Sequence, residues 1–168
     1  MAGVSAVVDF ERPPHAVSSP TEPRDLGVGV PGGVACTHGI AAVTVAAING
    51  TGQRPPPGNT LLILRSGSDV VRAVVGQRPG QVAIDDSGSV AAIAVNTDAG
   101  AAVQQVDLTS GRVTSTVSLP ESLQAEAMSV IDGHIFLVGG SGGVIIPVGS
   151  GQTTPIELPG NNVTSVWA

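Results

Sequence analysis

The chain consists mostly of short runs of apolar and β-branched residues, separated by turns that contain glycine. One pattern recurs three times: an apolar run, a Ser-Gly turn and a second β-prone run. The three turns are Ser66-Gly67, Ser110-Gly111 and Ser150-Gly151. Hairpin turns often need a positive φ angle, which glycine adopts without strain. Each copy therefore predicts a β-hairpin with this glycine in its turn.

A Pro-Gly pair marks a further strand in each repeat. The segment Pro31-Gly32 to Ala35 resembles Pro79-Gly80 to Ala83, and Pro159-Gly160 begins a third copy. The divergent stretch 121–127 stands where the remaining copy is expected. Its Glu, Ala and Gln content after a proline permits a short helical turn over 120–127.

With this strand included, each unit contains four strands, named a, b, c and d in chain order. The second unit has them at 81–85, 90–96, 102–108 and 112–119. We expect those of the first unit near Val34 and at 40–48, 60–64 and 69–75, and those of the third at 127–131, 134–138, 144–148 and 153–158. The segments 4–10, 15–18 and 25–30 read as strands b, c and d, and 163–167 reads as an a strand. The two ends together predict a fourth unit.

Four such units predict an all-β fold, a β-propeller of four-stranded blades that the C-terminal strand closes. An open ring would leave unpaired strand edges, which a strand from the other terminus would cover. The expected blade units, within one domain, are 1–30 plus 163–168, 31–76, 77–119 and 120–159. They would form either a four-bladed ring or half of a larger propeller. A β-sandwich with accidental periodicity is the alternative fold.

The segment Val106–Val113, with Asp85–Gly88 before it, resembles the blade repeats of the YVTN/lactonase-like and quinoprotein-like propellers. The resemblance covers most of residues 28–168 and implies the propeller fold. It leaves the function open, because that group includes enzymes as well as binding modules. It also favours an extracytoplasmic location, in a periplasm or cell envelope, although the residues themselves leave the compartment unknown. Propellers of this group usually have more than four blades.

Composition and charge exclude several classes of function. The 23 glycines and 13 prolines suit short strands with tight turns, and aromatic residues make up only 2%. The net charge of -6, with seven basic residues, disfavours binding to nucleic acid or to an anionic membrane surface. No apolar run approaches the roughly 18 residues of a membrane-spanning helix. A single cysteine, Cys36, excludes an internal disulfide and a cysteine-based zinc cluster.

Two glycine motifs match catalytic or nucleotide-binding patterns but fit structural roles better. Gly27–Gly32 matches G-x-G-x-x-G, yet β-branched residues follow it where a nucleotide site needs a helix N-terminus. We expect it at a strand end and a d–a turn. Gly139–Gly143 matches the nucleophile elbow G-x-S-x-G, but another strand follows it. We expect a glycine-rich b–c loop there.

The histidines and acidic turns do not predict a metal site. Cys36 and His38 are close in sequence, but His15 and His134 belong to other units, so three or four ligands would not converge. We expect Cys36 to be buried as a small apolar residue. The Asp-Gly sequences at 85–88 and 132–133 are a–b turn signals rather than calcium ligands. We therefore predict no metal and no cofactor.

The b–c and d–a loops of a propeller lie on one face, which is our candidate binding surface. The longest of these loops, 49–59, contains Arg54 followed by three prolines that favour an extended conformation. A solvated linker is the alternative role for this loop. The side chains that we expect on the surface are Asn49, Arg54, Arg78, Asn96, Asp98 and Glu121.

We predict a non-catalytic propeller module that presents this loop face to a protein, a glycan or a small ligand. The expected inner strands are nearly free of charge, and no acid–base pair, activated nucleophile or cofactor clamp is visible. A homodimer is a further partner that the fold allows. The alternatives are a lactonase-like or quinoprotein-like enzyme, and half of a larger propeller whose partner half carries the chemistry. Trp167, as the single tryptophan, disfavours the quinoprotein type.

Overall fold

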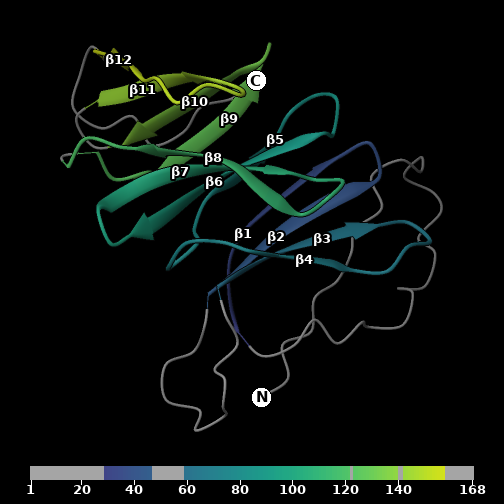
Figure 1. The fold of residues 1–168 in the computed structure, drawn as a ribbon. Coiled ribbons are helices and arrows are strands. Elements are labelled where there is room, and N and C mark those ends of the chain that lie inside the picture. The colour runs from purple at the N-terminus through teal and green to yellow at the C-terminus, as the bar shows by residue number, and fades with distance from the viewer. Residues whose placement is uncertain (1–28, 47–58, 122, 140–141, 158–168) are drawn as a thin grey trace, which may run out of the picture.

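A computed structural model describes residues 29–46, 59–121, 123–139 and 142–157, which form three four-stranded antiparallel sheets (Figure 1). The first sheet contains β1 (Val30–Thr37), β2 (Ile40–Ala46), β3 (Thr60–Arg65) and β4 (Val71–Val74). The second contains β5 (Val82–Ile84), β6 (Val90–Thr97), β7 (Gly100–Asp107) and β8 (Arg112–Ser118). The third contains β9 (Ala127–Ile131), β10 (His134–Gly139), β11 (Gly142–Pro147) and β12 (Thr154–Ile156).

In every sheet the strands pair in chain order, so each sheet is a simple meander. The first strands of the three sheets are neighbours, because β5 contacts both β1 and β9. The second sheet therefore lies between the other two, as Figure 1 shows. Among the described residues, no helix is long and apolar enough to cross a membrane.

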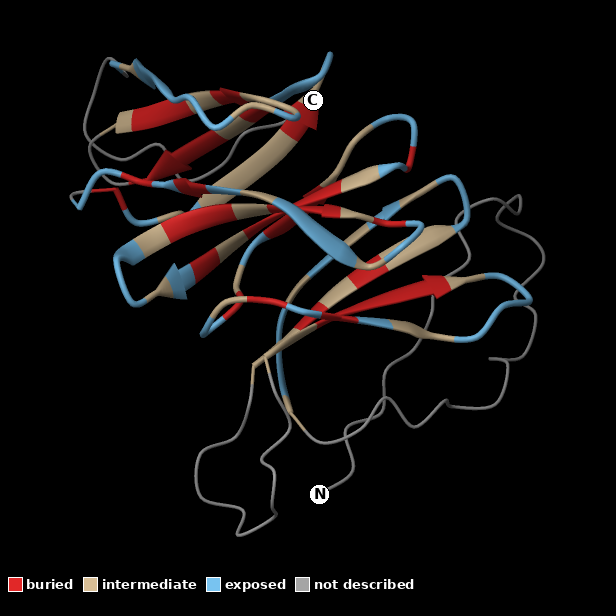
Figure 2. Cartoon of the chain, viewed as in Figure 1, coloured by how far each residue is buried: buried red, intermediate tan, exposed pale blue. Residues whose placement is uncertain are grey.

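Two apolar cores fill the spaces on the two faces of the second sheet. Ile93 of β6 belongs to the core shared with Leu61 and Ile63 of the first sheet. Its neighbour Ala92 belongs to the other core, together with Leu137 of the third sheet. A strand that is buried on both faces needs apolar residues at successive positions, which explains the unbroken apolar run at 91–95. Figure 2 shows the buried strand centres and the exposed turns.

The two Pro-Gly pairs at 31–32 and 79–80 lie beside each other, where the first and second sheets meet, and the third pair lies outside the described residues. The pairing of β1 with β2 shifts register between Pro31 and Val34, so Gly32 and Gly33 form a bulge. A Cβ atom at Gly32 would lie 2.4 Å from the carbonyl oxygen of Pro79. This contact explains Gly32 by close backbone packing, whereas a Cβ atom at Gly80 would meet nothing nearer than the carbonyl oxygen of Ala94, at 3.9 Å.

The buried side chain of Thr44 fixes this contact. Its hydroxyl donates to the carbonyl oxygen of Gly80 at 2.7 Å and accepts from the amide of Gly33 at 2.7 Å. A single side chain of the first sheet thus satisfies polar backbone groups of two sheets. Buried polar groups without partners are costly, so this arrangement specifies how the two sheets meet.

The strands that the repeats predict in units one to three are confirmed, with ends that shift by a few residues. Val30, which the prediction assigned to the preceding d strand, begins β1, because the bulge lets this strand continue past Gly32. The helical turn that the sequence permits over 120–127 is not seen in the described residues of this stretch, 120–121 and 123–127. A single hydrogen-bonded turn replaces it, in which the amide of Leu123 donates to the carbonyl oxygen of Pro120 at 2.9 Å.

Two of the three predicted turn glycines have the expected left-handed conformation. The φ angles are +71° at Gly67 and +69° at Gly111. In the third repeat the prediction of Gly151 is wrong, because Gly149 has the positive φ angle, +78°. The amide of Gly149 donates to the side chain of Gln105, which holds this turn against the second sheet.

Cys36 is exposed, so the prediction of a buried cysteine is wrong. Side chains alternate along β1, and it is the neighbouring Ala35 that packs against the core. Desolvation still raises the pKa of the Cys36 thiol, which makes it a weaker nucleophile at neutral pH. Of the predicted fourth unit, all of 163–168 and all of 1–30 except Gly29 and Val30 lie outside the described residues.

Candidate functional site

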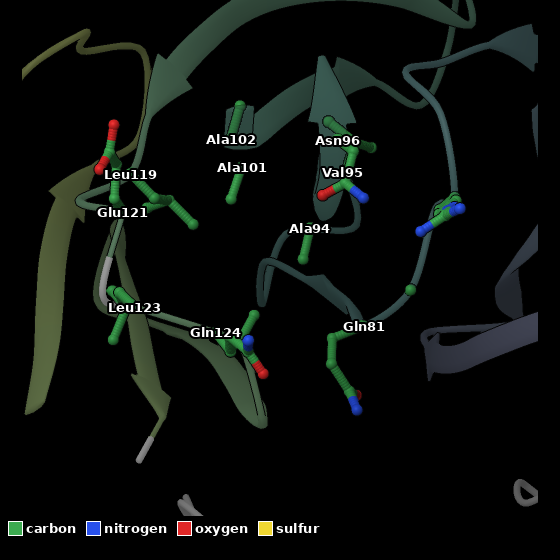
Figure 3. A pocket seen from close by; sticks show the side chains of 13 residues that line it. Gln81, Ala94, Val95, Asn96, Ala101, Ala102, Leu119, Glu121, Leu123 and Gln124 are labelled. Carbon is green, nitrogen blue, oxygen red and sulfur yellow. The ribbon is translucent and has the colours of Figure 1, made fainter. Parts of the chain in front are cut away.

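A pocket of about 370 Å³ opens at the end of the second sheet, where β6 turns into β7. The loops from β4 to β5 and from β8 to β9 form its other walls. Its apolar lining includes Ala94, Val95, Ala101, Ala102, Leu119, Leu123 and Ala125. Its polar lining is Arg78, Gln81, Asn96, Glu121 and Gln124, all of them exposed. In Figure 3, Glu121 and Leu123 lie across the hollow from Gln81 and Asn96.

One wall of the pocket holds Arg78 in an unusual backbone conformation. Its φ angle is +46°, which is uncommon for a residue other than glycine, and Pro79 follows it. The flanking backbone is fixed on both sides. Gln77 and Asn96 exchange hydrogen bonds of 2.8 Å and 2.7 Å, and Gly80 donates to the β6 backbone at 2.9 Å. Arg78 therefore lies on a bulge between two hydrogen-bonded backbone positions. Its positive φ angle costs about 1–3 kcal/mol of stability.

Gly76 fixes the start of this bulge. Its amide donates to the side-chain oxygen of Gln104 at 2.8 Å. A Cβ atom at this position would lie 2.8 Å from Val95 and 2.9 Å from the carbonyl oxygen of Asn96. The wall that carries Arg78 is thus packed directly onto β6, which gives the guanidinium a rigid base.

The opposite wall is held by a second close backbone contact. A Cβ atom at Gly139 would lie 1.6 Å from the carbonyl oxygen of Gln124, so the loop passes directly over β10. The amide of Glu126 donates to the carbonyl oxygen of Val138 at 3.0 Å. Leu123 is buried in the core between the second and third sheets. These contacts fix the loop that carries Glu121 and Gln124.

The polar side chains around the pocket have no partner within the part of the chain that the structure describes. Among the described residues, no hydrogen bond or ion pair involves the side chains of Arg78, Gln81, Asn96, Glu121 or Gln124. The pocket therefore presents one cation, one anion and three carboxamides beside an apolar surface. Such a set can recognise a small polar ligand that also carries apolar groups.

Comparisons with known proteins extend only to the fold. No family model and no curated protein sequence matches the chain. The hydrazine synthase of Kuenenia stuttgartiensis is similar in structure, with a TM-score of 0.61 and 10% identity over 80% of this chain and 38% of that one. A gluconolactonase of Xanthomonas campestris has a TM-score of 0.58 and 13% identity over 80% of this chain and 49% of that one. AztD of Citrobacter koseri has a TM-score of 0.52 and 12% identity over 78% and 47% of the two chains.

The fold is that of a β-propeller. The three similar structures agree in this fold. The described sheets are three of its blades, so the propeller is only partly covered. The chain spans less than half the length of each of these three proteins.

In the propeller, the pocket lies on the face that the b–c and d–a loops share. Three of the predicted surface residues, Arg78, Asn96 and Glu121, line this one pocket. Asp98 is exposed in the neighbouring turn from β6 to β7 but does not line the pocket. The other two predicted residues, Asn49 and Arg54, lie outside the described residues.

Gln81 and Gln124 line the pocket but were not predicted from the sequence. Gln81 follows Pro79-Gly80 at a position where the first repeat has Gly33, so the difference between the two repeats is the signal that could have found it. Gln124 lies in the divergent stretch and has no such signal. Isolated glutamines form no recognisable motif, and only the packing of the blades brings these two together.

The described blades contain no group of three or more His, Cys, Asp or Glu residues that could hold a metal ion. His38 lies in the β1–β2 turn with its Nδ1 2.9 Å from the hydroxyl of Thr37. The Nδ1 of His134, in the third blade, is 2.9 Å from the carbonyl oxygen of Asp132. His15 lies outside the described residues.

The carboxylate of Asp85 holds the β5–β6 turn instead of a ligand. It accepts hydrogen bonds from the hydroxyl of Ser87, from the amide of Ser89 at 2.8 Å and from the amide of Val90 at 2.7 Å. Partial desolvation raises the pKa of Asp85, but these hydrogen bonds outweigh it and the net pKa is lowered. These hydrogen bonds give the carboxylate a structural role in the turn that the sequence predicts for this segment.

Proposed function

We propose that the chain is a propeller binding module and that the pocket between the second and third blades is its ligand site. The observation that carries this proposal is a set of polar side chains that pair with no described residue, on two walls that backbone contacts hold in place. Arg78 lies on a strained bulge that is paired to β6 on both sides. Strained residues tend to cluster where a site must be preorganised.

The composition of the pocket supports binding rather than catalysis. Among the described lining residues, Glu121 is the single acid, and the lining contains no histidine, cysteine, serine or lysine. Nucleophilic catalysis needs a nucleophile with an adjacent base, a pair that these described lining residues do not supply. The volume of about 370 Å³ is near the lower end of the range for small-molecule sites.

The second candidate is a lactonase-like enzyme, which the structural similarity to a gluconolactonase favours. A third is half of a larger propeller whose other half carries the chemistry. Hydrolysis of a panel of lactones by the full chain tests the lactonase-like candidate. The native mass of the full chain in solution tests the half-propeller candidate. A doubled mass would fit a second copy of this chain as the other half, which would argue against a different half that carries the chemistry.

A pocket-filling substitution tests the binding proposal. Ala101 is half-buried and lines the pocket, so Ala101→Leu would fill part of it. The matched control is Ala99→Leu, at an exposed position of the same turn that does not line the pocket.

We expect at least one member of a panel of peptides, sugars and organic acids to raise the Tm of the parent chain. The shift should persist in Ala99→Leu and disappear in Ala101→Leu. A ligand that stabilises all three proteins equally, or a panel without any ligand, would contradict the proposal.

A further inference from the structure

The outer edge of the second blade is the least protected of the described outer edges. β4, β8 and β12 are the last strands of their sheets, and within the described residues each pairs on one side only. β4 has four residues and includes Arg72, and β12 has three residues and includes Pro155. A charge or a proline at an edge hinders pairing with a further strand. β8 has seven residues, and from Val113 to Ser118 it contains neither.

The second half of β8 is regular. The pairing of β8 with β7 shifts register between Gln105 and Val106, which leaves a bulge at Thr114. A bulge twists an edge and hinders pairing at that point. After the bulge, residues 115–118 pair with 102–105 without a further shift. The stretch 115–118 is therefore the part of this edge that can accept another strand.

The backbone groups of Thr116 and Ser118 point away from β7. The amide of Leu119 donates to the carbonyl oxygen of Ala101 at 2.9 Å, so these two residues form a hydrogen-bonded pair. Hydrogen-bonded and non-bonded pairs alternate along an antiparallel ladder. The residues two and four positions before Leu119 therefore bond to β7, whereas Thr116 and Ser118 direct their amide and carbonyl groups to the free edge. Both residues are also exposed.

We propose that this edge pairs with the same edge of a second copy of the chain, antiparallel and centred on Val117. Thr116 of each copy would then lie opposite Ser118 of the other, and the two pairs would exchange four backbone hydrogen bonds. The two middle blades, each of four strands, would form one continuous sheet of eight. This surface is separate from the ligand pocket, whose lining includes none of residues 115–118.

The side chains of β8 suit pairing with a second copy of the same strand. Threonine and serine directly opposite each other stabilise antiparallel strands through their hydroxyl groups, whereas like charges destabilise them. Arg112 begins β8, and Glu121 follows its end. An antiparallel arrangement brings the start of each strand to the end of the other, so the charges of the two copies are complementary. A parallel arrangement would bring the two arginines together.

Sedimentation velocity of the full chain over a range of concentrations tests this inference. We expect the parent to reach twice the monomer mass of 16.6 kDa as its concentration rises. Ser118→Pro removes the outward amide of Ser118 from each copy, and proline is tolerated on an edge where its nitrogen faces away from the sheet. It should weaken the dimer by roughly tenfold, as expected for the loss of two of the four hydrogen bonds.

A charge exchange tests whether the two edges face each other. The double substitution Thr116→Lys with Ser118→Lys would place like charges opposite each other in both pairs, so this variant should stay monomeric. The double substitution to glutamate should do the same. An equimolar mixture of the two variants should form heterodimers, which native mass spectrometry identifies by mass. The control Val74→Lys, at an exposed position of β4, should dimerise like the parent.

The outcomes separate this edge from other modes of association. If the parent stays monomeric at every concentration, the inference is wrong. A dimer that persists in Ser118→Pro and in both double variants would also overturn it, because a ring completed by a second copy would use the end blades and not β8. Monomeric double variants that fail to form heterodimers would contradict the pairing of Thr116 with Ser118. If Ser118→Pro loses its native unfolding transition, the lysine and glutamate variants still decide. The loss of ligand binding in Ala101→Leu tests the proposed function independently of all these results.

Discussion

The side chain of Gln105 holds the backbone of Gly149 in the next blade. Its Oε1 accepts from the Gly149 amide at 2.7 Å, and its Nε2 donates to the carbonyl oxygen of Ser150 at 3.2 Å. Gln105 is only 1% exposed, so these bonds form where water cannot replace them. They fix the β11–β12 turn against β7 and therefore fix the position of the third blade relative to the second.

Replacing Gln105 with leucine should destabilise the protein. The substitution keeps the side-chain size but leaves the Gly149 amide and the Ser150 carbonyl without this partner, at a cost of about 1–3 kcal/mol. Urea unfolding measures the change in the free energy of unfolding. The control Gln152→Leu, at an exposed position, should stay within about 0.5 kcal/mol of the parent. Equal effects of the two substitutions would refute this role for Gln105.

Thr44→Val tests the hydroxyl that joins the first two blades. Valine has nearly the same shape, but it leaves the Gly33 amide and the Gly80 carbonyl oxygen unsatisfied. We expect a loss of about 1–3 kcal/mol in the free energy of unfolding. Thr44→Ser keeps the hydroxyl and should cost less. If serine destabilised more than valine, packing of the methyl group would matter more than the hydrogen bonds.

Gly139→Ala should disturb the pocket wall that carries Glu121. The added Cβ atom would lie 1.6 Å from the carbonyl oxygen of Gln124, so the loop must move. We expect a loss of about 1–3 kcal/mol and faster hydrogen exchange in residues 123–126. The control is Gly142→Ala, where the nearest contact is 3.3 Å from the carbonyl oxygen of Ile156. Unchanged exchange in 123–126 would show that the contact does not hold the loop.

Acid should remove the stabilisation that Asp85 contributes. The pKa of this carboxyl is lowered in the folded protein, so the folded state favours the charged form. The contribution is fully present above the unfolded-state pKa of about 3.9 and is lost as the pH falls through the folded pKa. The difference in unfolding free energy between the parent and Asp85→Asn should shrink between about pH 5 and pH 2. Asp86→Asn controls for the charge, and a difference that is independent of pH would contradict the prediction.

The sequence predicted the blades well because each blade repeats a short-range pattern. The turns at Gly67 and Gly111 have the expected conformation, and the strands around them follow. The prediction failed in the turn of the third repeat, where Gly149 takes the place expected of Gly151, because Gln105 of another blade holds this turn. Long-range contacts of this kind leave no local pattern in the sequence.

The lining of the pocket could be predicted only in part, for the same physical reason, and its role as a binding site stays a prediction. The rule that b–c and d–a loops share one face brought together Arg78, Asn96 and Glu121, which the structure places around one pocket. Asp98 lies on the same face, in the β6–β7 turn, but it does not line the pocket. Gln124 lines the pocket because its loop packs closely against Gly139, a residue from which the sequence predicted only a loop. Topology predicts a shared face, whereas a pocket depends on packing between particular residues.

The most direct measurement of ligand binding at this pocket is a residue-level NMR titration of the full chain with the panel ligand that raises its Tm most. A 16.6 kDa protein is small enough for backbone amide spectra. We expect the largest chemical-shift changes at the amides of Arg78, Asn96, Glu121 and Gln124, with little change at the turns of Gly67 and Gly111 at the opposite strand ends. Changes centred on those two turns, or no saturable change anywhere, would contradict a ligand site at this pocket.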